Sequence, residues 1–396
     1  MQSNSTTNTT GLDAFRRTCY GAGAMEMLEF YAAAIPGTEK ALCEELRELG
    51  FASVRLNRGG VPFRGEPSEG WRACLESRIA QRIQLLLGRF PCPSEQALFD
   101  GVQTIDWSAY LTPNHTLSVS AVCIASTITH SGFAGLKVKD AIVDQVRART
   151  GRRPSVDRED PDIRVFLYLA NNKATLYLDL SGEPLHRRGY RKETGDAPLR
   201  ETLAAAMLRM SRWDRSSTLV DPMCGSGTIA IEAAMWARNM APGLTRKQFG
   251  FERWAGFGAD DDEALRTMRG ELRAAVSGQV PRIIAADNDP NVLDMARANA
   301  RAAGVKLAFK ERDVREMQGD QAAHIIVTNP PYGVRLEKSP TFCREVTAIF
   351  SRLHGWRVCL LAGSPDYERE LSATPQYRRR LSNGDIDCVF LVYDID

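Results

Sequence analysis

The segment Asn329-Pro330-Pro331-Tyr332 carries the most specific chemical signal in this 396-residue chain. An exocyclic amino group on a base is a poor nucleophile, because its lone pair is delocalised into the ring. The side-chain oxygen of Asn329 and the carbonyl of Pro330 can accept both N–H bonds and favour a pyramidal nitrogen. Two prolines stiffen the loop, and Tyr332 offers a flat face to an unstacked base. These four residues are the candidate catalytic residues; the alternative is a proline-rich turn with an ordinary asparagine.

A glycine-rich loop at residues 221–228 lies between an expected strand and an expected helix. Glycine lets the backbone approach a ligand closely, and the helix N-terminus offers free N–H groups. The candidate cofactor-binding residues here are Asp221, Met223, Cys224, Gly225, Gly227 and Thr228. The pattern Gly225-x-Gly227-x-x-Ala230 matches a dinucleotide fingerprint, which also needs an acidic residue about 20 positions later. The next convincing strand ends at Asp287, 60 positions beyond Gly227, so a nicotinamide cofactor is disfavoured.

Two carboxylates follow the next two expected strands. Asp287, with Asn288 after it, can accept both hydroxyls of a ribose. Asp313, followed by Val314, can accept from an adenine amino group. Alone, each aspartate is more often a turn or helix-capping residue, but at the ends of successive strands the pair outlines an adenosine. With Asn329 as a further contact, the order of the motifs indicates S-adenosyl-L-methionine as the cofactor and a base amino group as the methyl acceptor.

The elements that must position these residues alternate between strand and helix, which predicts a parallel, doubly wound sheet in the second half of the chain. The expected strands are 218–221, 282–287, 307–310, 324–328, 357–362 and 387–394, and the expected helices are 201–210, 228–239, 291–303 and 341–353. Every motif follows one of these strands, where ligands bind in such sheets. The first half predicts two smaller α+β units, with strands at 27–31, 54–56, 60–63, 117–125, 163–169 and 174–180 and helices at 38–49, 71–87 and 135–150.

Composition and length indicate a folded chain of two or three domains. Hydrophobic residues make up 43%, charged residues 25%, and the net charge is +2, which disfavours disordered, collagen-like and globally basic classes. No apolar run reaches membrane-spanning length and no apolar leader is present, so a cytoplasmic location is expected. Nine scattered cysteines without Cys-x-x-Cys indicate reduced thiols, and no metal site is expected.

A local basic excess lies between residues 136 and 192, where thirteen Lys or Arg face eight Asp or Glu. Basic side chains with an interleaved aromatic ring suit contacts with RNA backbone and bases. The candidate RNA-binding residues are Lys137, Lys139, Arg152, Arg153, Arg187, Arg188, Tyr190 and Arg191. The alternative is a solvated surface on which some of these charges pair with Asp157, Glu159 or Asp160.

Taken together, these motifs resemble the THUMP-domain RNA guanine-N2 methyltransferases, and most closely the first half of the long bacterial members that act on 23S rRNA. The similarity runs from about Phe30 to the C-terminus and includes 137–144, 160–165, 178–182, 188–191, 201–206, 221–234 and 241–244. It implies a Rossmann-like class I methyltransferase domain preceded by α+β ferredoxin-like and THUMP domains. The expected divisions are a disordered extension at 1–24, part of the ferredoxin-like domain at 25–68, THUMP at 69–182, a linker at 183–200 and the methyltransferase at 201–396.

The resemblance implies methylation of the exocyclic N2 amino group of a guanosine in 23S rRNA, on rRNA or a pre-ribosomal particle, by a monomer. A tRNA guanine-N2 methyltransferase, a DNA adenine-N6 methyltransferase and a non-catalytic RNA-binding assembly factor remain as alternatives. The THUMP-like half disfavours the DNA enzyme, and the intact Asn329-Pro330-Pro331-Tyr332 disfavours the assembly factor. The longer family members also make 7-methylguanosine with a second methyltransferase. This sequence has no second set of motifs, so that activity is expected from another polypeptide.

Overall fold

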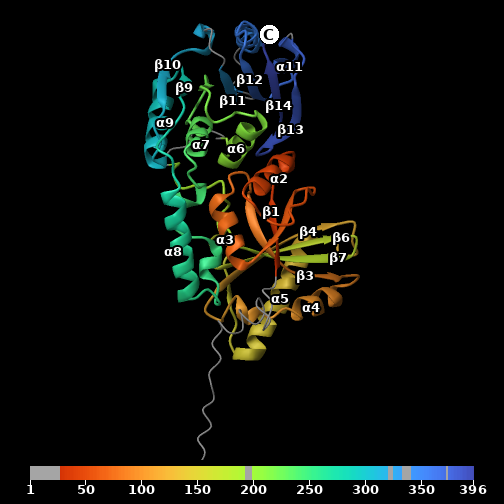
Figure 1. Ribbon diagram of the computed structural model, residues 1–396. Coiled ribbons are helices and arrows are strands. Elements are labelled where there is room, and N and C mark those ends of the chain that lie inside the picture. Colours follow the sequence, from red (N-terminus) through yellow and green to blue (C-terminus); the bar gives the residue numbers. More distant parts are fainter. Residues whose placement is uncertain (1–26, 192–198, 320–323, 332–339, 372) are drawn as a thin grey trace, which may run out of the picture.

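The computed structural model describes residues 27–191, 199–319, 324–331, 340–371 and 373–396. In these residues two seven-stranded sheets follow one another along the chain, each with helices packed against it (Figure 1). One hydrophobic cluster fills the first half. Two further clusters contain alternate residues of the second sheet, as in Leu219 and Val220, so helices or loops pack on both of its faces.

The first sheet has the strand order β2-β1-β3-β7-β6-β4-β5. Its strands are β1 Leu28–Ala33, β2 Gly60–Gly65, β3 Arg82–Pro91, β4 Thr116–Ile124, β5 Ser155–Val156, β6 Ile163–Ala170 and β7 Lys173–Asp179. Its helices are α2 Glu39–Glu48, α3 Pro67–Glu76, α4 Glu95–Gln103 and α5 Ser131–Thr150, with a short 3₁₀ turn η1 at Trp107–Ala109. Because β3 pairs with β1 on one side and β7 on the other, the two expected α+β units share one continuous sheet.

The helix predicted over residues 71–87 is wrong, because α3 ends early in that range and β3 occupies its last part. The carboxylate of Glu45 accepts hydrogen bonds from Ser77 Oγ at 2.8 Å and from the Arg78 N–H at 3.0 Å. These contacts hold the chain in a turn after α3. The apolar spacing alone fits either a helix or a strand, and a contact distant in sequence decides between them. The strand predicted over 54–56 is also not formed.

The second sheet has the order β10-β9-β8-β11-β12-β14-β13. Its strands are β8 Leu219–Asp221, β9 Ile283–Asp287, β10 Ala308–Glu311, β11 Ile325–Thr328, β12 Arg357–Ala362, β13 Tyr377–Asn383 and β14 Ile386–Asp394. Its helices are α6 Glu201–Met210, α7 Thr228–Ala237, α8 Ala259–Ala274, α9 Pro290–Ala303, α10 Pro340–Phe350 and α11 Asp366–Glu370, with short 3₁₀ turns η2 Pro242–Thr245, η3 Gly250–Arg253 and η4 Val314–Glu316. The class I architecture is confirmed, with the antiparallel β13–β14 hairpin added at one edge of the five parallel strands.

The segment between α7 and β9 connects the two halves and contains α8, which the sequence patterns did not predict. Figure 1 shows α8 beside α3, and the ring of Trp71 in α3 stacks on Phe251 with centroids 5.5 Å apart. A Cβ added to Gly243 would lie 2.6 Å from the Cα of Leu75, so the two backbones meet there in direct contact. The insertion that separates Gly227 from Asp287 in sequence is therefore a packing element between the halves.

Candidate active site and cofactor site

The glycine loop runs from the end of β8 to the first residue of α7, as predicted. Gly225 and Gly227 have φ angles of 54° and 85°, which favour glycine. A Cβ at Gly225 would meet nothing within 4 Å, whereas one at Gly227 would lie 3.1 Å from the Cβ of Ala296 in α9. Gly225 thus leaves open space beside the loop for a ligand, and Gly227 allows α7 and α9 to pack closely.

Asp221 lies buried at the end of β8 and links the glycine loop to β11. Its Oδ1 accepts a hydrogen bond of 2.8 Å from Thr328 Oγ1, and the Met223 N–H also donates to its carboxylate. Burial raises the pKa of Asp221 to about 7. The next loop residue, Cys224, is also buried, and burial raises its thiol pKa well above the usual value. Thr328, which the sequence motifs did not single out, therefore fixes the strand end directly before Asn329.

Asp287 lies at the end of β9, next to the glycine loop. Its Oδ2 accepts a hydrogen bond of 2.9 Å from the Gly225 N–H, and its Oδ1 accepts one of 3.2 Å from the Asp289 N–H. The carboxylate has lone pairs beyond these two bonds, since each carboxylate oxygen can accept twice. Asp287 can therefore hold the loop and still accept ribose hydroxyls.

Asp313 follows β10 and is paired with the guanidinium of Arg315 at 2.6 Å. Hydrogen bonds from Arg315 are the largest cause that lowers the pKa of Asp313 to about 2, and Asn288 contributes a smaller bond. The predicted residues Asn288 and Asp313 therefore lie together, with Val314 buried beside them. Because Arg315 already donates to the Asp313 carboxylate, Asp313 can accept from an adenine amino group only with its remaining lone pairs.

Asn329 directly follows β11, and Pro330 after it is buried. The Asn329 Oδ1 is buried and has no hydrogen-bond partner within the described residues. An unpaired buried acceptor is costly unless a ligand or another donor completes it. Pro331 is half-buried, while Tyr332 lies outside the described residues. The predicted acceptor is thus present at the carboxyl edge of the sheet, next to the strand that carries Asp221.

Two of the predicted RNA contacts, Arg188 and Tyr190, are wrong because the structure buries them, and a third, Arg191, is largely engaged by the protein itself. Arg188 and Tyr190 are each 2% exposed. The guanidinium of Arg188 lies 3.5 Å from the carboxylate of Glu232 in α7, and Tyr190 Oη donates to the same carboxylate at 3.1 Å. Arg191 donates to Glu201 at 2.9 Å and to Thr228 Oγ1 at 3.0 Å. These side chains hold α6 and α7 rather than facing solvent.

The other predicted RNA contacts remain at the surface. Arg152 and Arg153 are exposed after α5, and Arg187 is 64% exposed and paired with Glu183 at 3.0 Å. Lys139 pairs with its neighbour Asp140, and Lys137 lies 5.7 Å from the ring centroid of Phe99. That these residues contact RNA phosphates therefore stays a prediction.

Two observations of the site fit S-adenosylmethionine. Space is open beside the Gly225 backbone, and at the same sheet edge no described residue donates to the Asn329 acceptor. In the described part of the chain no group of three or more His, Cys, Asp or Glu residues could hold a metal ion. Across the same ranges no helix is long and apolar enough to cross a membrane.

Known protein families match three successive parts of the chain. Residues 29–84 match the RlmL ferredoxin-like domain, residues 92–179 the THUMP domain, and residues 188–391 the RMKL-like methyltransferase domain. Among curated proteins, the ribosomal RNA large subunit methyltransferase K/L of Magnetococcus marinus is 40% identical over 382 residues, which cover 93% of this chain and 53% of the relative. The protein of the same name from Aeromonas salmonicida is 38% identical over 397 residues, covering 93% and 54%. The chain thus spans about half the length of these curated relatives.

Solved structures agree with the family match. A possible methylase from Clostridium difficile 630 superposes with a TM-score of 0.84 at 30% identity, covering 94% of this chain and 99% of the other. A methyltransferase in complex with S-adenosylhomocysteine gives 0.82 at 28%, covering 94% and 99%. A structure described as a predicted N6-adenine-specific DNA methylase from Listeria monocytogenes gives 0.83 at 29%, covering 93% and 96%. The chain therefore belongs to the RMKL-like methyltransferase family, with ferredoxin-like and THUMP domains before the catalytic domain and S-adenosylmethionine as its cofactor.

Proposed function

We propose that this chain methylates the exocyclic N2 amino group of a guanosine in 23S rRNA. The single observation that carries the proposal is the buried Oδ1 of Asn329 at the carboxyl edge of the sheet, which has no hydrogen-bond partner among the described residues. The curated relatives named as large-subunit rRNA methyltransferases and the THUMP match support rRNA as the substrate class.

The roles of the residues follow from their positions. Gly225 and Asp287 hold the adenosine side of the cofactor, and Asp221 with Thr328 fixes the loop and strand end between which it lies. Bound there, S-adenosylmethionine supplies a methyl group activated by its sulfonium charge.

Asn329 Oδ1 and the Pro330 carbonyl accept the two N–H bonds of the guanine amino group. Acceptors fixed in this way direct the nitrogen lone pair out of the ring and towards the methyl carbon. The nitrogen–carbon bond forms as the carbon–sulfur bond breaks, giving 2-methylguanosine and S-adenosylhomocysteine, and the surplus proton leaves to water. Asn329 acts by holding the amino group, since an amide is no base at neutral pH.

RNA outside the target nucleotide needs its own binding surface. The proposed phosphate contacts of the first half are the exposed Arg152, Arg153 and Arg187 and the half-buried Lys137 and Lys139. Such contacts give affinity without base specificity and hold the RNA in register for the catalytic domain.

The competing function is adenine-N6 methylation of DNA, because the Listeria structure carries that description and the Asn-Pro-Pro-Tyr motif suits either amino group. The test offers methyl-labelled S-adenosylmethionine with 23S rRNA from a strain that lacks the modification, with tRNA and with duplex DNA. The labelled nucleoside is then identified after digestion. Label in 2-methylguanosine from 23S rRNA supports the proposal. Label in N6-methyladenosine from DNA, or only in tRNA, would replace it with the corresponding rival.

A further inference from the structure

A cavity of about 160 Å³ lies on one face of the second sheet, away from the helices α7 and α9. Its residues come from alternate positions of neighbouring strands, such as Val220 in β8 and Ile284 in β9. Since alternate residues point to the same face, this is a stretch of sheet surface rather than a gap between domains. The connection from β10 to β11 forms only the short η4 turn in its described part, so no helix there covers Ile284, which stays half-buried.

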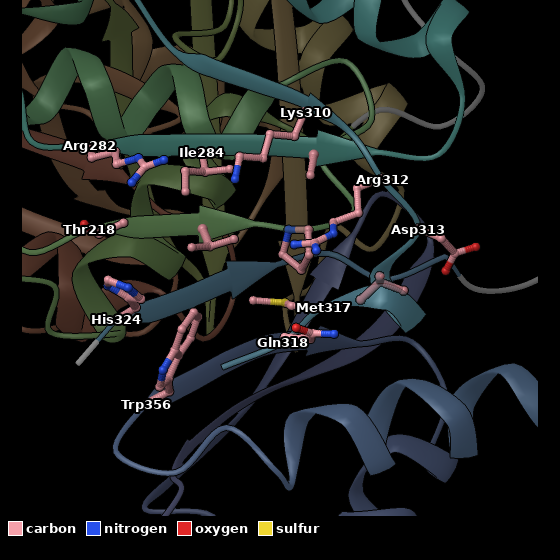
Figure 2. Close-up of a pocket in the computed structure, with 14 residues that line it drawn as sticks. Thr218, Arg282, Ile284, Lys310, Arg312, Asp313, Met317, Gln318, His324 and Trp356 are labelled. Atoms are coloured by element: carbon pink, nitrogen blue, oxygen red, sulfur yellow. The ribbon is translucent and has the colours of Figure 1, made fainter. Parts of the chain in front are cut away.

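Three cations line one side of this cavity. Figure 2 shows Arg282, Lys310 and Arg312 along that side, and His324, Trp356, Met317 and Gln318 along the opposite side. All three cations are exposed, and within the described ranges none of them forms an ion pair. Among the described residues that line the cavity, Asp313 is the one acid; it points away from the cavity and is neutralised by Arg315.

The cavity is distinct from the cofactor edge but close to it. Pro222 and Asp313 form its end towards the glycine loop, while Thr218 and Arg282 form the other end. Thr218 directly precedes β8, and His324 directly precedes β11, the strand that leads to Asn329. β11 has four residues, roughly 13 Å at 3.3 Å per residue, so one short nucleic-acid segment can reach both places.

We propose that this groove binds a second, single-stranded segment of the RNA substrate, with one base over the apolar floor and its phosphates on Arg282, Lys310 and Arg312. The cavity volume of about 160 Å³ is similar to the roughly 150 Å³ of an apolar cavity that holds one aromatic ring. Apolar surface for a base with unpaired cations for the backbone is how single strands are bound without sequence preference. Charge complementarity favours RNA over an apolar or basic protein segment.

The proposal rests on RNA being the substrate, and its test separates the two. The double variant Arg282→Ser/Lys310→Ser removes two groove cations without touching the glycine loop, Asp287 or Asn329. A matched control, Arg301→Ser/Lys306→Ser, removes one arginine and one lysine that are exposed and lie outside the groove. Binding of a short fluorescein-labelled single-stranded RNA of mixed sequence is followed by anisotropy against salt concentration, and S-adenosylhomocysteine binding by calorimetry.

The groove variant should bind the RNA more weakly, and the slope of log affinity against log salt should fall by about 0.7 per lost contact, about 1.4 in all. The control should keep the parent slope, and both variants should bind S-adenosylhomocysteine as the parent does. A cavity-filling variant, Ile284→Trp, should weaken RNA binding with the slope unchanged, because it removes the space for a base and no charge.

Equal affinity and slope in the groove variant and the parent would overturn the proposal, and so would equal losses in the groove and control variants. The first outcome would leave a protein partner as the occupant of the groove. The proposed function is read separately, from the nucleoside that the parent methylates. If the groove variant binds RNA as the parent does while the parent still forms 2-methylguanosine, only the groove is refuted. If the groove variant binds more weakly but the parent methylates another nucleoside, only the guanosine assignment is refuted.

Discussion

Two groups of basic side chains in this chain differ in whether a carboxylate lies within reach. Arg188 and Arg191, which stand in the densest basic stretch of the sequence, are enclosed and bonded to Glu232, Glu201 and Thr228. Arg282 and Lys310 are far apart in sequence, yet they meet on one open sheet face without acidic partners in the described part of the chain. Charge density along a sequence is therefore a poor guide to a nucleic-acid surface. What matters is whether the fold places a carboxylate within reach.

The strongest test of this contrast is Arg188→Ala, compared with Arg187→Ala at the neighbouring position. Arg188 also donates to the carbonyls of Leu185 and Arg78, so its loss leaves the Glu232 carboxylate and these acceptors short of a partner. We expect a decrease in the free energy of unfolding of about 3–5 kcal/mol for Arg188→Ala and about 0.5 kcal/mol or less for Arg187→Ala. Urea unfolding followed by tryptophan fluorescence measures both. Equal small decreases would contradict a buried structural role for Arg188.

The second-largest effect is expected on catalysis, which should depend on Asn329 and on neither group of basic side chains. Asn329→Ala removes one of two fixed acceptors and should lower turnover by about 10²–10³, with RNA affinity and its salt slope unchanged. Asn329→Asp keeps an acceptor oxygen at the same place and should retain more activity than the alanine variant. Single-turnover rates at saturating RNA and cofactor are the measurement. Near-normal turnover of Asn329→Ala would show that another group holds the amino nitrogen.

Unlike the buried acids Glu232 and Glu201, which pair with arginines, Asp221 has no cationic partner among its described hydrogen bonds. Its pKa is raised from 3.8 to about 7 by burial, so the folded state keeps a proton that the unfolded state releases between these values. The free energy of unfolding should therefore decrease as the pH rises from about 4 to 7, by at most about 1.4 kcal/mol per pH unit from this group. Asp221→Asn keeps an acceptor for Thr328 and should flatten this part of the profile. An unchanged profile in stability measurements across that pH range would contradict the assignment.

The smallest effect concerns the surface of the first half. Arg152→Ser/Arg153→Ser should reduce the salt slope of RNA binding by about 0.7 to 0.9 for each residue that contacts a phosphate. Turnover at saturating RNA should stay at the parent level, because the site around Asn329 is untouched. The same anisotropy titration used for the groove measures the slope. A parent-like slope would assign these arginines to solvent and leave the groove as the main phosphate surface.

Sequence patterns predicted those parts of the structure that depend on neighbours along the chain. The helix over 201–210 and the strand over 357–362 were placed at their observed bounds, and the glycine loop, Asp287 and Asn329 come together at one sheet edge as expected. The failures depend on contacts between distant residues. The hydrogen bond from Arg78 to Glu45 ends the expected helix before β3, and the ion pair with Glu232 keeps Arg188 buried.

The groove could not be predicted for the same reason. Lys310 and Arg282 are separated by a strand, a helix and two loops, and nothing in either local sequence distinguishes them from ordinary surface cations. Only the register of β10 on β9, where Lys310 pairs with Ala286, places them on the same face.

The strand β3 sets a limit on how this protein can be divided. The match to the ferredoxin-like domain ends at residue 84 and the THUMP match begins at residue 92, so any cut between them passes through or beside β3, which spans Arg82–Pro91. A cut through β3 would divide an interior strand of the seven-stranded sheet and expose the hydrogen-bonding edges of β1 and β7, and a cut beside it would expose an edge of β3 or β7. Such edges pair with other chains and aggregate. The two N-terminal domains are therefore one unit for expression, and recombining family members at this boundary would have to exchange both together.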